Sequence, residues 1–297
     1  MAAPPEHLRA KTVADLTRWL EREVGPRLRK ETEAIAHGGT ALTLLGIKDS
    51  TKDVDLAFRS REAFDGFVSA LGSLGFSRAA DFRANPREVF HRLQNPASIV
   101  DVVDLRFPTW NNWRLSKAVL RRAVILPLSR VRLVRPDRDA VFLFKTYPLR
   151  ETDVDDLRTI LAVDPPDEAR VLELFEDQDA IHRSELSVAT AHEPLFNILE
   201  LRVRFAASLQ LLGPSWRRKI PRIARHAGQR LADLHLGHSL AKLIRILRTA
   251  DFVSWDEVLS GDFEPLRARL AKEPSRRAGP KGRKIDGREL QRRRPSP

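Results

Sequence analysis

The stretch AHGGTALTLLGIKDSTKDVDLAF, residues 36–58, decides the fold. Gly38 and Gly39 are followed, after a spacer of thirteen residues, by Asp53 and Asp55, which flank one valine at the head of an apolar run. The pattern predicts a short strand over 32–37, a helix from about 40 to 46, and a second strand at DVDLAF. A glycine turn therefore separates a strand from a helix, and an acidic strand follows.

The two aspartates are spaced to share one face of their strand. Side chains at i and i+2 point to the same side, and Asp53 and Asp55 are separated by roughly 6.6 Å at a rise of about 3.3 Å per residue. Carboxylates so placed can bind the two magnesium ions of a phosphoryl-transfer site, which stand about 3.5 to 4 Å apart. The spacing predicts that both aspartates are metal ligands.

A third carboxylate is expected from a neighbouring strand. The segment REVFHRLQNPASIVDVVDLRF predicts a hairpin that turns at Asn95–Pro96, and its second strand carries Asp101 and Asp104. These two are three residues apart, so they face opposite ways and only one can join the site. An ionised Asp101 among valines is costly unless it is paired or metal-bound, which favours Asp101 while Asp104 stays open.

The glycines suit a phosphate ligand. Gly38 and Gly39 lack a Cβ, so the backbone can approach a ligand closely, and amides at the start of the following helix can bind phosphate oxygens. Thr40 could cap that helix and offer its hydroxyl to a γ-phosphate. We therefore expect Gly38, Gly39 and Thr40 to seat a nucleoside triphosphate.

Two blocks of the sequence resemble a known family. Gly38–Gly39, the spacer and D-V-D-L are similar to the signature of the DNA polymerase β-like nucleotidyltransferase superfamily. FLFKTYPLRETDVDDLRTIL, residues 142–161, resembles the K-x(4)-R-x-x-D-x-x-D block of bacterial and archaeal nucleotidyltransferase-like proteins, which include abortive-infection type toxins of toxin–antitoxin pairs. The resemblance covers residues 30–162. It implies a nucleotidyltransferase fold, roles for Lys145 and Asp156 in nucleotide binding and activity, and an antitoxin protein as a candidate partner.

The charges of the second block also indicate interactions independently of the resemblance. Lys145 follows the apolar run 141–144, where a cation needs a partner, and a triphosphate would supply one. Arg150 has the spacing to pair with Asp153 on one helix face. For Arg150, Asp153 and Asp155 an ordinary salt-bridged helix face is an equal alternative.

The chain divides by composition into three parts. Strand patterns cluster in the first 135 residues, with helices expected at 115–125 and about 137–162, so residues 1–164 are predicted to form an α+β nucleotidyltransferase domain with a small mixed sheet and flanking helices. After Asp164–Pro165–Pro166 almost every segment has helical period, which predicts an all-α domain over 165–272. Residues 273–297 are rich in Pro, Gly and Arg and predict a disordered basic tail.

Bulk composition restricts the class of partner. The 297 residues carry a net charge of +12, of which the last 25 residues hold +6, and this favours an anionic partner such as a nucleotide or nucleic acid. The absence of cysteine excludes disulfides, thiolate zinc sites and cysteine nucleophiles. Because no stretch of the sequence has the apolar length of a membrane span, we expect a cytoplasmic protein with no membrane partner.

Together these patterns predict a magnesium-dependent nucleotidyltransferase. It would move a nucleoside monophosphate from an NTP to an acceptor hydroxyl on RNA (tRNA, for example), protein or a small molecule. The resemblance to toxin nucleotidyltransferases adds a toxin of a toxin–antitoxin pair as one form of this function. Asp101 or Asp104 would help to deprotonate that hydroxyl, and Lys145 would neutralise phosphate charge. The rival hypothesis is a non-catalytic protein of the same fold that binds nucleic acid or a protein partner.

Overall fold

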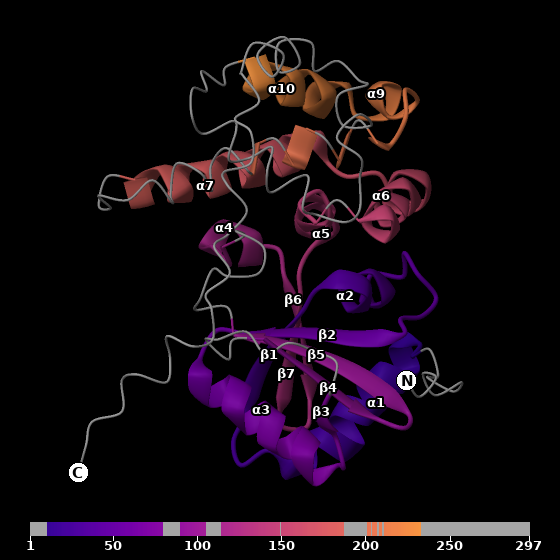
Figure 1. Cartoon of the computed structure of the whole chain (residues 1–297), viewed down its shortest axis with the longest axis vertical. Helices are drawn as coiled ribbons and strands as arrows, with labels where there is room; N and C mark the ends of the chain where they lie inside the picture. Colours follow the sequence, from indigo (N-terminus) through magenta and orange to yellow (C-terminus); the bar gives the residue numbers. More distant parts are fainter. Residues whose placement is uncertain are drawn as a thin grey trace, which may run out of the picture.

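The computed structural model describes residues 11–79, 90–104, 114–148, 150–186, 201–202, 204–206, 208–209 and 211–232. A sheet lies at one end of this part, and most of the helices lie at the other (Figure 1). The strands are β1 (Thr32–Ala36), β2 (Asp53–Phe58), β3 (Ser77–Arg78), β4 (Phe90–Asn95), β5 (Ser98–Asp104), β6 (Val124–Leu128) and β7 (Val131–Arg135). The helices are α1 (Val13–Trp19, continued by π and 3-10 turns to Arg27), α2 (Gly38–Leu44), α3 (Arg61–Ser73), α4 (Lys117–Leu120), α5 (Arg138–Lys145), α6 (Glu151–Val163), α7 (Glu168–Leu186), α9 (Trp216–Lys219) and α10 (Pro221–Ala232).

The seven strands form one mixed sheet in the order β3-β4-β5-β2-β1-β7-β6. β2 pairs with β5 in parallel, and β1 pairs with β7 in parallel. The other neighbours are antiparallel, including β1 with β2 and β4 with β5. The predicted mixed sheet with flanking helices is therefore confirmed, with β2 and β5 at its centre.

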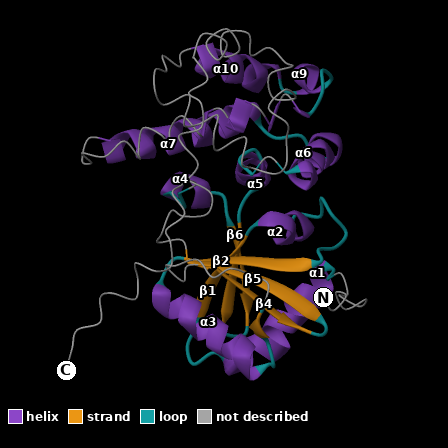
Figure 2. Cartoon of the chain, viewed as in Figure 1, coloured by secondary structure: helices purple, strands orange, loops and turns teal. Residues whose placement is uncertain are grey.

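The two faces of the sheet differ in chemistry. Alternate residues of β2 on one face, Val54, Leu56 and Phe58, are fully buried in the main core, which α3 covers (Figure 2). Among the described residues, the other face holds a small apolar cluster, made of Ile35, Ala57, Val103 and Val134 with Leu115, Leu120 and Ala123 around it. This second face also carries Asp53 and Asp55, because they alternate with the buried set along β2.

The prediction of a single helix over about 137–162 is wrong, because the structure has two helices there. α5 ends at Lys145 and α6 begins at Glu151, with an extended Arg150 between them. Pro148 explains the break, since proline lacks the donor N–H of a helix interior and disfavours helical geometry in the residue before it. The chain reverses at this point, and α6 returns alongside α5.

The helix predicted over 115–125 is also too long. α4 stops at Leu120, and residues 124–128 form β6, which pairs with β7 through a tight turn at Ser129. Ser129 has a positive φ of 56°, as such turns require. The sequence VILPL favours a strand through its β-branched residues, and Pro127 is tolerated because β6 is an edge strand.

The described residues after 164 are mainly helical. α7 packs against α5 and α4, and α10 packs against α7 and α9. Residues 187–200 and 233–272 of the predicted all-α domain, and the predicted tail at 273–297, lie outside the described residues. In the part of the chain that the structure describes, no helix has the length and apolar character needed to span a membrane.

Candidate active site

Three of the predicted carboxylates lie on the same face of the sheet, the one opposite the main core. In the parallel pairing of β2 with β5, Asp55 lies opposite Asp101, and Asp53 precedes Asp55 by two residues on the same face. Asp104 lies three residues further along β5, opposite Phe58. The register therefore brings Asp101, and not Asp104, beside Asp53 and Asp55.

The glycine pair forms the turn directly above these carboxylates. Gly38 has φ +54°, and a Cβ at this position would lie 2.4 Å from Oδ2 of Asp55. The amide of Gly39 donates to the same Oδ2 at 3.0 Å. The absence of a Cβ at Gly38 and the amide of Gly39 thus bring the start of α2 against Asp55, so the turn positions a carboxylate as well as presenting amides.

Thr40 differs from its predicted role. The N-cap of α2 is His37, and Thr40 lies inside the first turn with no exposed surface. Its hydroxyl accepts a hydrogen bond from the amide of Asp55 at 2.8 Å and donates to the carbonyl of Asp53 at 3.4 Å. The hydroxyl therefore fixes the backbone of β2 between the two aspartates, and in this conformation it is not available to a phosphate.

The carboxylates repel one another. Burial raises the pKa of Asp53 above its ordinary value of 3.8, and the charges of Asp55 and Asp101 raise it further, whereas Arg92 lowers it. Burial also raises the pKa of Asp55, with a further increase from Asp101 that His37 and Lys145 partly offset. Such a cluster favours a cation between its members.

Arg92 on β4 is a site residue that the sequence analysis missed. It lies opposite Asp101 in the antiparallel pairing of β4 with β5. Its Nε donates to Oδ1 of Asp101 at 2.9 Å and its Nη2 to Oδ2 at 2.7 Å. To predict from sequence that Arg92 lies on the same face as the carboxylates, one must know which β4 residue pairs with Asp101. That pairing depends on the register of the hairpin around Asn95–Pro96.

His37 is a second residue that was missed. Burial lowers its pKa, and the charges of Asp55 and Asp101, which raise it, do not outweigh that effect. Its Nε2 atom is buried and has no hydrogen-bond partner among the described residues. A buried imidazole with an unsatisfied nitrogen therefore lies beside the carboxylates.

Lys145 lies in a buried ion-pair cluster. Its Nζ contacts Asp153 at 2.8 Å and Asp156 at 2.7 Å, and all three residues are nearly fully buried. Arg150 also pairs with Asp153, as the sequence predicted, and Lys48 pairs with Asp156. The ammonium of Lys145 is thus bonded to two carboxylates and is not free for a triphosphate.

This cluster is nevertheless close to the carboxylates of the sheet. Hydrogen bonds to Asp153 raise the pKa of Arg150, and the charge of Asp55 contributes to the same shift. Arg150 keeps half of its side chain exposed, which leaves room for another partner. Asp155 points away from the cluster and pairs on the surface with Arg158.

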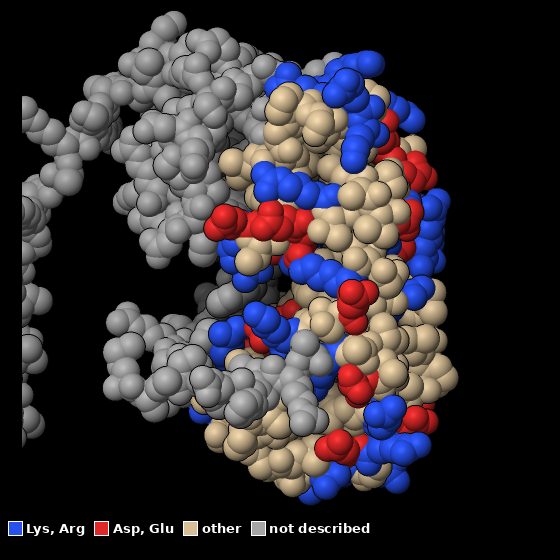
Figure 3. Space-filling view, turned by 90° about the vertical axis from the view of Figure 1, so that its right-hand side faces the viewer, with Lys and Arg blue, Asp and Glu red and all other residues tan. Residues whose placement is uncertain are grey.

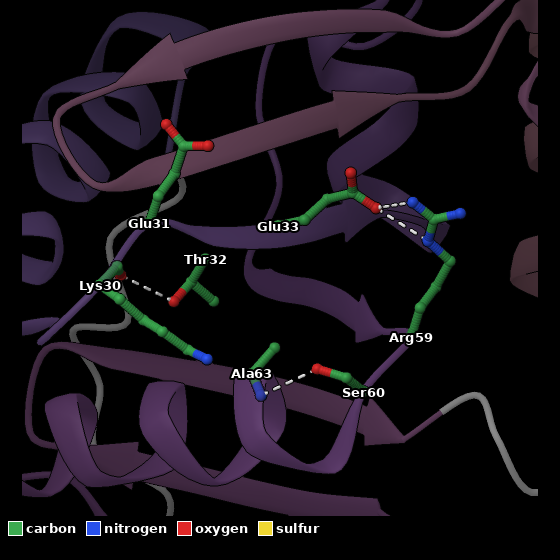
Figure 4. Close-up of a pocket in the computed structure, with 7 residues that line it drawn as sticks. All are labelled: Lys30, Glu31, Thr32, Glu33, Arg59, Ser60 and Ala63. Atoms are coloured by element: carbon green, nitrogen blue, oxygen red, sulfur yellow. Dashed lines mark hydrogen bonds and ion pairs between the residues drawn. The ribbon is translucent and has the colours of Figure 1, made fainter.

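A shallow pocket of 330 Å³ lies elsewhere on the sheet (Figure 4). Its lining residues are Lys30, Glu31, Thr32, Glu33, Arg59, Ser60 and Ala63. They lie at the start of β1 and beyond the end of β2, whereas Asp53 begins β2. Arg59 pairs with Glu33, and Lys30 pairs with Glu62, so these charges are satisfied internally and do not indicate a ligand.

The donor set fits magnesium. Carboxylate oxygens are the ligands that this ion prefers, and the raised pKa of Asp53 and of Asp55 reflects a need for positive charge. Among the described residues, no three His, Asp or Glu side chains converge closely enough in this conformation to hold a metal together. At Asp101, both carboxylate oxygens accept hydrogen bonds from Arg92, so neither is free to bind a metal in this conformation.

Comparisons of the chain with protein-family models, with curated proteins and with solved structures find no match.

Proposed function

We propose that the protein is a magnesium-dependent nucleotidyltransferase of the polymerase β-like type. One observation carries the proposal, namely that Asp53, Asp55 and Asp101 share a sheet face on which the Gly38–Gly39 turn contacts Asp55. The order of glycine turn and D-x-D strand is that of the signature that the sequence resembles, and a third carboxylate on a neighbouring strand is what a two-metal site needs. A cytoplasmic location, where NTPs are made and consumed, is part of the proposal.

The reaction transfers a nucleoside monophosphate. The acceptor hydroxyl oxygen bonds to the α-phosphorus, the bond from that phosphorus to the bridging oxygen breaks, and pyrophosphate leaves. Asp101 takes the hydroxyl proton, while the amides at the start of α2 other than that of Gly39, which is bonded to Asp55, donate to phosphate oxygens. Asp53, Asp55 and Asp101 would hold magnesium, which when bound neutralises the charge that develops on the phosphate.

Lys145 acts in this scheme through the residues around it. Because Lys145 is bonded to Asp153 and Asp156, it does not contact the phosphate directly. Its positive charge lowers the pKa of Asp55 and so favours the ionised carboxylate. Arg150 is half exposed and its charge interacts with that of Asp55, so it is the better candidate for touching the triphosphate. Asp156 holds Lys145 and Lys48 and is therefore a positioning residue.

Labelled substrates test the proposal. The protein is incubated with each of the four α-³²P-labelled NTPs and magnesium, together with tRNA, total RNA, protein extract or small hydroxyl compounds as acceptors. We expect label in one acceptor pool, abolished by Asp55→Asn. Asp155→Asn, which alters an exposed carboxylate of α6, is the matched control and should keep full activity. Background labelling by the unaltered protein in every pool would refute the enzyme.

The rival function, nucleic-acid binding without catalysis, is favoured by one surface. Arg218, Arg222 and Arg225 of the α9–α10 region are exposed, and Lys and Arg gather at this end of the molecule in Figure 3. Such a surface suits a phosphate backbone. RNA binding that depends on these arginines, survives removal of magnesium and accompanies no labelling would support this rival instead.

A further inference from the structure

Arg92 occupies the place between the carboxylates where a metal cation would be expected. Its guanidinium makes two hydrogen bonds to the two oxygens of Asp101, and its Nη2 lies 4.0 Å from Oδ2 of Asp53. The hydrogen bonds and charge of Asp101 raise the pKa of Arg92, with burial acting against them. Arg92 is therefore a permanently charged cation that ties two strands of the site together.

This contact conflicts with a metal-bound Asp101. A carboxylate that gives both oxygens to a guanidinium has its best acceptor directions filled, and a divalent cation must compete for them. The side chain of Arg92 is 37% exposed, whereas that of Asp101 is 9% exposed. Arg92 is consequently the partner with room to move, while Asp101 is held by the sheet.

We propose that Arg92 is a phosphate-binding residue of this site, held on Asp101 until a divalent cation takes that carboxylate and then transferred to the triphosphate. The inference rests on the proposed nucleotidyltransferase function. It adds a residue that neither block of the family resemblance contains, and it assigns a ligand to that residue in each of two states.

Charge balance supports the exchange. Without metal, the three carboxylates have Arg92 beside them, and the guanidinium reduces their mutual repulsion. With two divalent ions the carboxylates are more than neutralised, so the guanidinium is repelled from them and attracted by the triphosphate. Arginine presents its donors in a planar fork that matches two phosphate oxygens, so the same geometry that binds Asp101 can bind the substrate.

The test measures metal and phosphate binding separately on the full chain. Mn²⁺ binding is followed by electron paramagnetic resonance, and inorganic triphosphate binding at saturating Mg²⁺ by calorimetry. We expect Arg92→Gln to bind Mn²⁺ about 10-fold more tightly than the unaltered protein, and triphosphate about 10-fold to 100-fold more weakly, because a hydrogen bond to a charged partner is lost. Inorganic triphosphate removes any dependence on the identity of the base.

Arg59→Gln is the matched control. Arg59 pairs with Glu33 beyond the far end of β2, so its loss should change neither affinity. Where Arg92→Gln fails to fold, Arg92→Lys keeps the charge without the paired donors and is expected to shift both affinities in the same directions. Thermal unfolding of each variant identifies such a failure.

The outcomes separate the two proposals. If the unaltered protein binds Mn²⁺ and triphosphate, and Arg92→Gln binds both equally well, the role of Arg92 is refuted and the nucleotidyltransferase proposal stands. If the unaltered protein binds no Mn²⁺, and Asp55→Asn behaves identically, the metal site and with it the proposed function are refuted. Tighter Mn²⁺ binding with unchanged triphosphate binding would refute the transfer of Arg92 to phosphate.

Discussion

Asp55 and Asp101 lie opposite each other in two parallel central strands. Side chains at such positions are direct neighbours on one sheet face, and like charges there destabilise the sheet. The fold nevertheless adds a third carboxylate, Asp53, to the same face. Repulsion among the three carboxylates therefore lowers the free energy of unfolding. From this we can predict how stability responds to pH and to metal.

Asp53→Asn is expected to stabilise the metal-free protein at neutral pH. The folded pKa of Asp53 is raised, so its ionised form costs stability above that folded pKa. The cost diminishes as the pH falls through the folded pKa, and it is absent below the ordinary value of 3.8. Because solvent screens this half-buried group, we expect a gain of about 1 kcal/mol or less, or roughly 2 to 4 °C in Tm.

Thermal unfolding between pH 3 and 8 checks the prediction. Asp65→Asn, which removes an exposed carboxylate paired with Arg61 on α3, should give no gain at any pH. Added Mg²⁺ should raise the Tm of the unaltered protein more than it raises the Tm of the Asp53→Asn variant. A ligand that binds only the folded state stabilises it, and the variant has lost one of the proposed metal ligands. A gain that persists at pH 3 would contradict charge repulsion as the cause.

Gly38→Ala tests the close approach of the turn to Asp55. Both Gly38 and Gly46 have a positive φ, so alanine at either position costs about 1 to 2 kcal/mol of backbone strain. A Cβ at Gly38 also meets Oδ2 of Asp55 at 2.4 Å, whereas a Cβ at Gly46 meets nothing within 4 Å. Urea unfolding should therefore show a larger loss for Gly38→Ala, and only this variant should lose Mn²⁺ binding. Equal effects on both measurements would show that Asp55 does not depend on the turn.

Thr40→Val tests the hydroxyl that bridges the two aspartates. Valine has nearly the same shape but leaves the buried amide of Asp55 without its acceptor, which costs about 1 to 3 kcal/mol. Thr43→Val is the control, since the Thr43 hydroxyl is equally buried but donates within α2 to the carbonyl of Gly39. We expect weaker Mn²⁺ binding for Thr40→Val alone. Unchanged metal affinity with reduced stability would restrict Thr40 to a structural role.

Local pattern was enough to predict the elements that carry the carboxylates. The period of two in DVDLAF places Asp53 and Asp55 on one face, and the turn at Asn95–Pro96 sets up the strand of Asp101. The sequence favoured Asp101 but left Asp104 open, because the choice depends on how β5 is aligned with β2. Strand alignment is a long-range property that no local pattern contains.

The partners of individual side chains were the least predictable part. Lys145 was expected to meet a phosphate, yet it meets Asp153 and Asp156, because the break at Pro148 folds α6 back onto α5. Arg92 was not singled out, because its significance depends on its position opposite Asp101. The break between α5 and α6 thus determined the partners of Lys145, and the register of β4 with β5 determined the partner of Arg92.

Lys145→Met is expected to destabilise the fold severely. It removes the buried cation that Asp153 and Asp156 share, and only the more exposed Arg150 and Lys48 remain beside them. Loss of one partner of a buried ion pair costs about 3 to 5 kcal/mol, and we expect the lower end of that range here because each carboxylate keeps one cation. Arg158→Met, which breaks an exposed pair with Asp155, should cost about 1 kcal/mol or less. Urea unfolding of both variants at pH 7 measures the difference.

The pH range of that loss follows from the two pKa shifts. Burial lowers the pKa of Lys145, but the two carboxylates outweigh it and the folded pKa lies above 10.5, so its contribution is present below 10.5 and is lost as the pH rises through the folded value. Burial raises the pKa of Asp153, but Arg150 and Lys145 bring it below 3.8, so its contribution is present above 3.8 and is lost as the pH falls through the folded value. The cost of Lys145→Met should therefore be greatest between these limits. If Lys145→Met abolished triphosphate binding at unchanged stability, Lys145 would be a direct phosphate ligand and the structural role assigned to its cluster would be wrong.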